Sequence, residues 1–281
     1  MKTPFAFLLA AAALSAQAPR KMTLFEGGAA GYKGYRIPAL VMTAKGTLLA
    51  FCAARKELGD WADIDIAMRR STDRGQTWEP MRIVAGRGTM TADNPVPIAD
   101  RKTGAVHFLL QVNYAQLYYM RSGDDGRTFS SPVDITEAAH DFRRGRVPEE
   151  SETQYGWSVV APGPGHGIQL ASGRLLSTIW MSPHYKHRPS AVATIHSDDH
   201  GKTWKSGALL PRNLVNPSEH AALELADGRV MTSIRSEGKE HRRALAYSPD
   251  GISNWTAPEL HPELFEPVCM ASLIRLSAPP K

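Results

Sequence analysis

The chain has 281 residues, of which 42% are hydrophobic, 8% aromatic and 22% charged. This composition is typical of a folded globular protein and excludes a disordered or collagen-like chain. The net charge of +5 is small, and three of the positive charges, Lys2, Arg20 and Lys21, lie in or beside the N-terminal segment. Nucleic-acid binding is therefore not indicated, because it usually needs a clustered basic face.

The first 18 residues have the pattern of a secretory signal peptide. Lys2 supplies a positive start, residues 5–14 (FAFLLAAAAL) are apolar, and residues 16–18 (AQA) match a cleavage signal. A membrane anchor is the alternative, but this apolar stretch is too short to cross a hydrocarbon layer of about 30 Å as a helix. We expect residues 1–18 to be removed and residues 19–281 to form one secreted or periplasmic domain without a membrane span.

The two cysteines, Cys52 and Cys269, lie in apolar, strand-like stretches. We expect both to be buried as small hydrophobic side chains, in preference to forming a disulfide. His184 and His187 could provide two metal ligands, but a third is not apparent in the sequence. The sequence therefore predicts neither a metal site nor a cofactor.

A pattern of the form S-x-D-x-G-x-T-W/F occurs at residues 71–78, 122–129 and 197–204, with a degenerate copy at residues 248–255. The copies start 51, 75 and 51 residues apart, and the longest interval contains a polar insertion around residues 136–156. Aspartate and glycine at these positions favour a tight turn. We expect the four aspartates to close turns and not to act in catalysis; they are Asp73, Asp124, Asp199 and Asp250.

Short strand-like runs fill the intervals between these turns. Residues 64–69 and 191–196 directly precede two copies of the pattern. Three further runs each begin with a glycine and continue with apolar side chains; they are residues 46–51, 173–178 and 228–233. Repeats of about fifty residues without a long helix are typical of propeller blades, each made of four strands. The sequence therefore predicts an all-β propeller.

These repeats resemble the Asp boxes, or BNR repeats, of the sialidase superfamily. Residues 35–40 (YRIPAL) resemble the Arg-Ile-Pro motif that begins the sialidase domain, and residues 163–170 and 219–235 resemble two further family segments. The likeness extends from about residue 24 to residue 276. It implies a six-bladed β-propeller and an exo-α-sialidase that hydrolyses terminal sialic acid from glycans with retention. A sialoglycan-binding propeller without catalysis and another Asp-box glycan hydrolase remain as alternatives.

The resemblance also implies which arginines bind the substrate carboxylate. A planar carboxylate is well matched by guanidinium groups, which remain charged and donate two parallel hydrogen bonds. The family uses three arginines for this purpose; Arg36 matches the first and Arg235 the second. Arg55 resembles a further arginine of the pocket.

The expected catalytic groups follow from the same resemblance. Asp60 is the expected general acid, with Asp63 as the alternative, because both lie in the loop before the first Asp box. Glu219 matches the base that activates a tyrosine nucleophile, which avoids the repulsion that a carboxylate nucleophile would meet. Asp93 and Asn94 are expected in a loop that lines the sugar pocket, and Tyr155 and Trp157 are weaker candidates.

The third arginine and the tyrosine are expected after a segment that residues 264–273 resemble, whereas the sequence ends at Lys281. Six blades of about 50 residues need about 300–350 residues. We therefore expect a C-terminally incomplete propeller of about four to five blades, with an exposed apolar face and without turnover.

Overall fold

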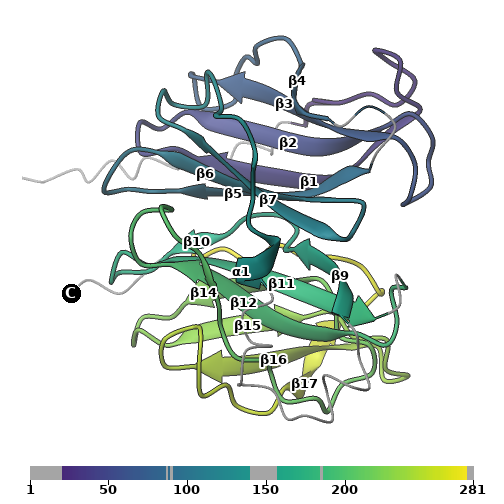
Figure 1. The fold of residues 1–281 in the computed structure, drawn as a ribbon, viewed down its shortest axis with the longest axis vertical. Coiled ribbons are helices and arrows are strands. Elements are labelled where there is room, and N and C mark those ends of the chain that lie inside the picture. Colours follow the sequence, from purple (N-terminus) through teal and green to yellow (C-terminus); the bar gives the residue numbers. More distant parts are fainter. Residues whose placement is uncertain (1–20, 87, 89–90, 140–156, 184–185, 277–281) are drawn as a thin grey trace, which may run out of the picture.

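Four antiparallel sheets follow one another along the described part of the chain. The computed structural model describes residues 21–86, 88, 91–139, 157–183 and 186–276. Figure 1 shows the sheets stacked along the vertical axis, with β1–β4 in purple and blue at the top and β14–β17 in light green and yellow at the bottom. Within each sheet the main strands are neighbours in sequence order, as expected for propeller blades.

The first sheet comprises β1 (Gly34–Met42), β2 (Leu48–Arg55), β3 (Ile64–Ser71) and β4 (Arg82–Ala85). The second comprises β5 (Ala92–Ala99), β6 (Val106–Val112), β7 (Gln116–Ser122) and β8 (Val133–Asp134), and α1 (Thr136–Ala139) follows it. The third comprises β9 (Trp157–Pro162), β10 (Ile168–Gln169), β11 (Leu175–Pro183), β12 (Ala191–Ser197) and β13 (Lys205–Ser206). The fourth comprises β14 (His220–Glu224), β15 (Val230–Ile234), β16 (Arg242–Ser248) and β17 (Glu259–Phe265).

Hydrophobic side chains fill the space between consecutive sheets. Phe51 of β2 and Phe108 of β6 are both buried, and their ring centroids lie 4.8 Å apart between the first two sheets. Burial of such a side chain stabilises the fold by about 1.5–3 kcal/mol. Further clusters connect the second sheet to the third and the third to the fourth, so every residue of β11 and β12 is buried.

The Asp boxes form the turns that follow β3, β7, β12 and β16, the third or fourth strand of each sheet in chain order. In the first box, Asp73 accepts hydrogen bonds from the Ser71 hydroxyl at 2.8 Å and from the Thr77 backbone N–H at 2.9 Å. The Gly75 backbone N–H donates to the Ser71 hydroxyl at 2.9 Å. The expectation that these aspartates close turns is confirmed in all four boxes.

One box residue also reaches the preceding sheet. In the second box, Asp125 accepts hydrogen bonds from the hydroxyls of Thr43 and Thr47, at 2.5 and 2.6 Å, and from Arg70 NH2 at 2.7 Å. Thr43 and Thr47 lie in the β1–β2 hairpin and Arg70 lies on β3. This buried group therefore joins the first sheet to the second.

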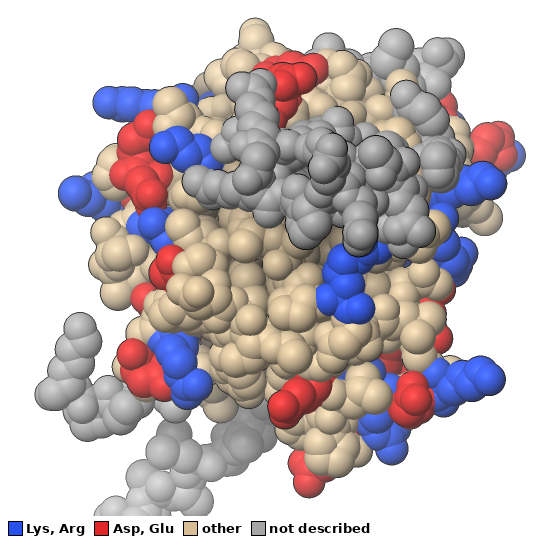
Figure 2. Space-filling model, turned by 60° about the horizontal axis from the view of Figure 1, so that its bottom comes forward, with Lys and Arg blue, Asp and Glu red and all other residues tan. Residues whose placement is uncertain are grey.

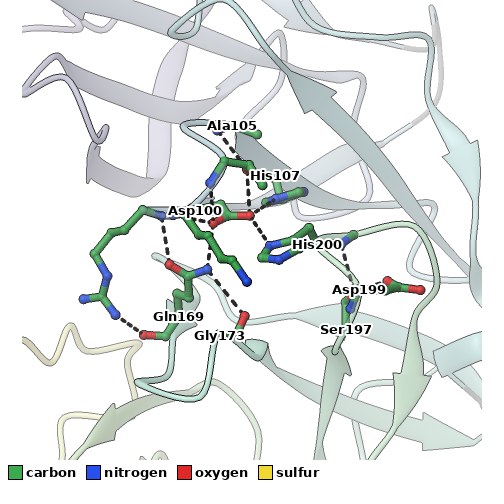
Figure 3. A network of polar contacts seen from close by, with 12 residues as sticks. Asp100, Ala105, His107, Gln169, Gly173, Ser197, Asp199 and His200 are labelled. Carbon is green, nitrogen blue, oxygen red and sulfur yellow. Dashed lines mark hydrogen bonds and ion pairs between the residues drawn. The ribbon is translucent and has the colours of Figure 1, made fainter.

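At the junction of the second and third sheets, the box position equivalent to Asp125 is His200 (Figure 3). His200 of the third box contacts the buried carboxylate of Asp100 at 2.7 Å, through its Nδ1 atom. Gln169 Nε2 donates to the other oxygen of Asp100 at 2.7 Å, and His107 Nε2 lies 3.5 Å from this carboxylate. Asp100 follows β5, so the group joins the second sheet to the third.

The two cysteines are free, and their environments differ. Cys52 on β2 is buried, as expected from the sequence. The expectation for Cys269 was wrong, because this residue follows β17 outside any strand and is exposed. Its backbone is held by buried polar groups, which leaves the thiol at the surface.

Charged side chains are distributed around the edge of the face shown in Figure 2, where Lys and Arg alternate with Asp and Glu. Such alternation favours local ion pairs, for example Arg174 with Asp198 at 2.7 Å. None of the described helices has the length and apolar character required to cross a membrane.

Candidate active site

A cavity of about 380 Å³ is lined by residues from all four sheets. Five of the six residues that the sequence predicts for the site line this cavity; they are Arg36, Arg55, Asp60, Glu219 and Arg235. They are separated by up to 199 positions in the sequence and meet because the sheets are arranged around it. The four box aspartates do not line it.

Arg55, the last residue of β2, organises one side of the cavity. Its side chain is buried, and its NH1 atom donates to the carbonyls of Leu58 and Gly59, both at 3.2 Å. The same atom donates to Asp60 Oδ1 at 2.7 Å, and NH2 donates to Asp93 Oδ2 at 2.9 Å. Arg55 thus fixes the loop that carries Asp60.

Asp60 is shared by two arginines, because Arg36 NH1 also donates to its Oδ1 atom at 3.1 Å. Burial would raise the pKa of Asp60, but the hydrogen bond and charge of Arg55 and the charge of Arg36 outweigh burial and lower it. The alternative acid, Asp63, pairs with Lys56 Nζ at 2.8 Å and does not line the cavity. The structure therefore brings Asp60, and not Asp63, to this site.

Glu219 and Arg235 lie side by side at the open end of the β14–β15 hairpin. Glu219 directly precedes β14, Arg235 directly follows β15, and the Arg235 backbone N–H donates to the Glu219 carbonyl at 3.0 Å. Their side chains form an ion pair, and both are largely buried. The spacing of 16 residues noted in the sequence is thus the length of the hairpin that pairs them.

Known proteins share both the sequence and the fold of this chain. The chain matches the family profile described as "BNR repeat-like domain" over residues 46–267. The chain belongs to the BNR-repeat family. The matched residues include all four Asp boxes, so this finding confirms the resemblance that the boxes indicate.

Several relatives of this BNR-repeat protein are sialidases. It is 30% identical to a sialidase of Bacteroides fragilis over 275 residues, which cover 87% of this chain and 47% of the relative. It is 31% identical to Sialidase-3 of Bos taurus, covering 85% of this chain and 61% of the relative. The chain thus spans about half to three-fifths of the length of these two curated relatives.

Solved sialidase structures share its fold. Hadza microbial sialidase Hz136 matches with a TM-score of 0.72 and 31% identity, over 85% of this chain and 49% of that structure. An intramolecular trans-sialidase of Ruminococcus gnavus matches with a TM-score of 0.70 at 17% identity, over 86% of this chain and 74% of that one. The all-β, propeller-type fold expected from the sequence is therefore confirmed.

The structure corrects the expected position of Asp93 in this BNR-repeat protein. Asp93 and Asn94 lie in strand β5 and not in a loop, and a bulge between Asp93 and Val96 interrupts the pairing with β6. The Asp93 side chain is fully buried behind the cavity, whereas Asn94 lines it. Burial raises the pKa of Asp93 to about 6, despite the opposing charge of Arg55.

The sequence did not indicate an aromatic wall in the cavity. The rings of Tyr114, Trp180 and His187 form a triangle. Their centroids lie 6.0 Å apart for Tyr114 and Trp180, 5.1 Å for Tyr114 and His187, and 5.6 Å for Trp180 and His187. Trp61 packs on Tyr114 at 4.7 Å and is half exposed. These residues come from three different sheets and connecting loops, so no local motif reveals them.

A second ion pair at the cavity was also missed. Arg188 donates to both carboxylate oxygens of Glu237, each at 2.6 Å, and Asn216 Nδ2 donates to Glu237 at 3.0 Å. Of the two weaker candidates, Trp157 begins β9 and Tyr155 lies outside the described residues.

Proposed function

We propose that the protein is an exo-α-sialidase that hydrolyses terminal sialic acid from glycans with retention of configuration. One observation carries this proposal. Arg36 and Arg235, the two expected carboxylate-binding arginines, line the same cavity as the expected acid Asp60 and the expected base Glu219. A sialic acid ring needs these groups together, because its carboxylate and its glycosidic bond share one carbon.

Arg36 and Arg235 differ in how they are held, and this supports complementary roles. The Arg36 side chain is 52% exposed and contacts Asp60, so it is free to turn toward an incoming anion. The Arg235 side chain is only 21% exposed and is fixed by Glu219. A pre-oriented guanidinium loses less conformational freedom when it binds a carboxylate.

Asp60 must be protonated to act as general acid, yet its pKa is lowered by Arg55 and Arg36 despite burial. We infer that a bound substrate carboxylate takes Arg36 from Asp60. Loss of one cation and arrival of an anion both raise the pKa of Asp60. Substrate binding thus favours the protonated form that donates to the leaving oxygen.

Glu219 would accept the proton of a tyrosine nucleophile, as the family resemblance implies. Of the described tyrosines, Tyr114 lines the cavity, but burial and then the charges of Asp93, Asp60 and Glu219 raise its pKa. Tyr114 therefore stays protonated and is a poor nucleophile. This observation favours sialoglycan binding without turnover as a second candidate function.

We propose six blades for the whole protein, and secretion or export to the periplasm through residues 1–18. The described sheets and the longer sialidase relatives support the first proposal. The apolar stretch at residues 5–14 and the cleavage pattern after it support the second.

The function is tested by incubating the whole protein, with the six blades proposed above, with an activated aryl sialoside and with a natural sialyllactose. Release of sialic acid, first as the α-anomer by NMR, is the expected result. Binding of the inhibitor DANA, known in complex with Trypanosoma rangeli sialidase, without turnover would support the second candidate. Turnover of a glycoside that lacks sialic acid, or no binding of either sialoside, would contradict the proposal.

A further inference from the structure

A buried ion pair lies directly behind one wall of the cavity. Glu266, the residue after β17, is fully buried, and its Oε2 atom accepts a hydrogen bond from Arg243 NH1 at 2.6 Å. Arg243 lies on β16 and is also buried. Both charges have been removed from water, so their positions depend on each other and on their remaining hydrogen bonds.

The pair holds the backbone of a single residue from both sides. The Cys269 backbone N–H donates to Glu266 Oε1 at 3.0 Å, and the Cys269 carbonyl accepts from Arg243 NH1 at 3.1 Å. Cys269 lines the cavity together with Val268 and Met270. The ion pair therefore fixes a segment that faces the same space as Glu219 and Arg235.

Arg243 also connects this segment to the strand that ends at Arg235. Its Nε atom donates to the Ser233 hydroxyl at 2.9 Å, and its NH2 atom donates to the Ser233 carbonyl at 3.0 Å. Ser233 lies on β15, two positions before Arg235. The Arg243 guanidinium thus connects residue 269 of the cavity wall to strand β15, which leads directly to Arg235.

The wall has a strained backbone at Val268, whose φ is 62°. A β-branched residue rarely adopts this left-handed conformation, and such strain persists only where surrounding contacts enforce it. The contacts that follow Val268 directly are those of Cys269 with the ion pair. The pair thus holds residues 268–270 in a shape that the chain alone does not favour.

We propose that Arg243 and Glu266 are positioning residues of the sialic acid pocket, which fix residues 268–270 as a rigid wall and set that wall against Arg235. The inference rests on the proposed function, because it assumes that the cavity takes a sialic acid. A wall that is ordered in advance reduces the conformational freedom lost on binding. Breaking the pair should therefore weaken ligand binding beyond any effect on stability.

The test compares Glu266→Gln with Asp125→Asn, since each variant neutralises a buried carboxylate paired with an arginine. Asp125 pairs with Arg70 at the junction of the first two sheets and does not line the cavity. Both variants should unfold at a lower temperature than the unaltered protein. Only Glu266→Gln should weaken DANA binding, by about tenfold or more, measured by calorimetry.

The rate of thiol labelling at Cys269 provides an independent measure of how firmly residues 268–270 are held. Cys269 is exposed and Cys52 is buried, so a thiol reagent should react at Cys269, and Cys269→Ser identifies that signal. DANA should slow labelling in the unaltered protein. Glu266→Gln should label faster and lose most of this protection, whereas Asp125→Asn should keep it.

If Glu266→Gln does not fold, Glu266→Asp serves instead, because it keeps the charge but shortens the reach to Cys269. Its DANA affinity should fall, and its Cys269 should label faster. Wild-type affinity in a folded Glu266 variant, or an equal loss in Asp125→Asn, would overturn the inference. Failure of the unaltered protein to bind DANA would instead overturn the proposed function, while the labelling difference between the variants still reports on the wall.

Discussion

The carboxylates of Asp73 in an Asp box and Asp93 at the cavity have different hydrogen-bond partners and opposite pKa shifts. In the first box, hydrogen bonds from Thr77 and Ser71, residues of the same turn, lower the pKa of Asp73 to about 2. At the cavity, Asp93 is held by Arg55 from another strand, and burial raises its pKa to about 6. The same side chain is thus stabilised as an anion at Asp73 and destabilised as an anion at Asp93.

The difference is also one of sequence distance between the partners. The third-position aspartate of each box binds groups within four residues of itself and stabilises a turn. A cavity carboxylate depends on arginines brought by distant segments, such as Arg36 for Asp60. Such arrangements are sensitive to a bound anion, because the anion competes for the same guanidinium.

The largest expected effect compares two neighbours in the second box. Asp125→Ala leaves the buried Arg70 with only the half-exposed Glu79 as a carboxylate partner and should lower the free energy of unfolding by about 3–5 kcal/mol. Asp124→Ala removes hydrogen bonds within an exposed turn and should cost about 1 kcal/mol. Urea unfolding measures both. Equal losses would show that the junction adds nothing to the turn.

A similar comparison applies to two arginines of one hairpin. Arg235→Ala should reduce transition-state or DANA binding by about 2–4 kcal/mol, because it removes a charge-assisted contact to the ligand carboxylate. Arg229→Ala is the matched control, since Arg229 contacts Asp227 and the Tyr247 ring at the other end of the hairpin and does not line the cavity. Sialoside kinetics and DANA titration provide the measurement. A comparable loss in Arg229→Ala would argue against a specific role for Arg235.

Asp60→Asn should lower kcat/KM for natural sialosides about a hundredfold. It should lower kcat/KM much less for aryl sialosides, whose good leaving groups need little protonation. Asp63→Asn should leave the ratio of the two substrates unchanged, because Asp63 pairs with Lys56 away from the cavity. The ratio of kcat/KM values is the measurement. If Asp63→Asn changed this ratio and Asp60→Asn did not, the acid would have been misassigned.

The smallest effect concerns pH. The folded-state pKa of Asp93, about 6, lies above its unfolded value of about 4, so its contribution is present below pH 4 and lost as pH rises through 6. Asp93→Asn should therefore remove a decline in unfolding free energy of about 2–3 kcal/mol between pH 4 and 7. For Asp73 the sign is opposite: its contribution is lost as pH falls from about 4 toward 2. Urea midpoints measured from about pH 2 to 7 test both signs. A decline in unfolding free energy between pH 4 and 7 that persists in Asp93→Asn would contradict the assignment.

Local features of the sequence predicted local structure well. The serine, aspartate and glycine of each box interact within four residues, so their pattern is sufficient to predict the turn. The segment from Glu219 to Arg235 forms a hairpin, which is also local. These elements could be predicted because each depends on few neighbours.

Three features that depend on contacts between sheets or with buried groups were not predicted. The Asp93-Asn94-Pro95 sequence is typical of a turn, yet tertiary pairing with β6 keeps it in a strand with a bulge. The apolar neighbours of Cys269 suggested burial, whereas buried polar groups hold its backbone at the cavity. Tyr114 and His187 meet only after the second and third sheets pack together.

At two of the four boxes, the residue before the box glycine contacts the preceding sheet. At the second box this residue is Asp125, which faces Arg70, and at the third box it is His200, which faces Asp100. Exchanging the two would set a carboxylate against Asp100 and an imidazole against Arg70, so both junctions would lose their complementary charges. The two junctions share one turn motif, but the variable residue before its glycine makes them non-interchangeable.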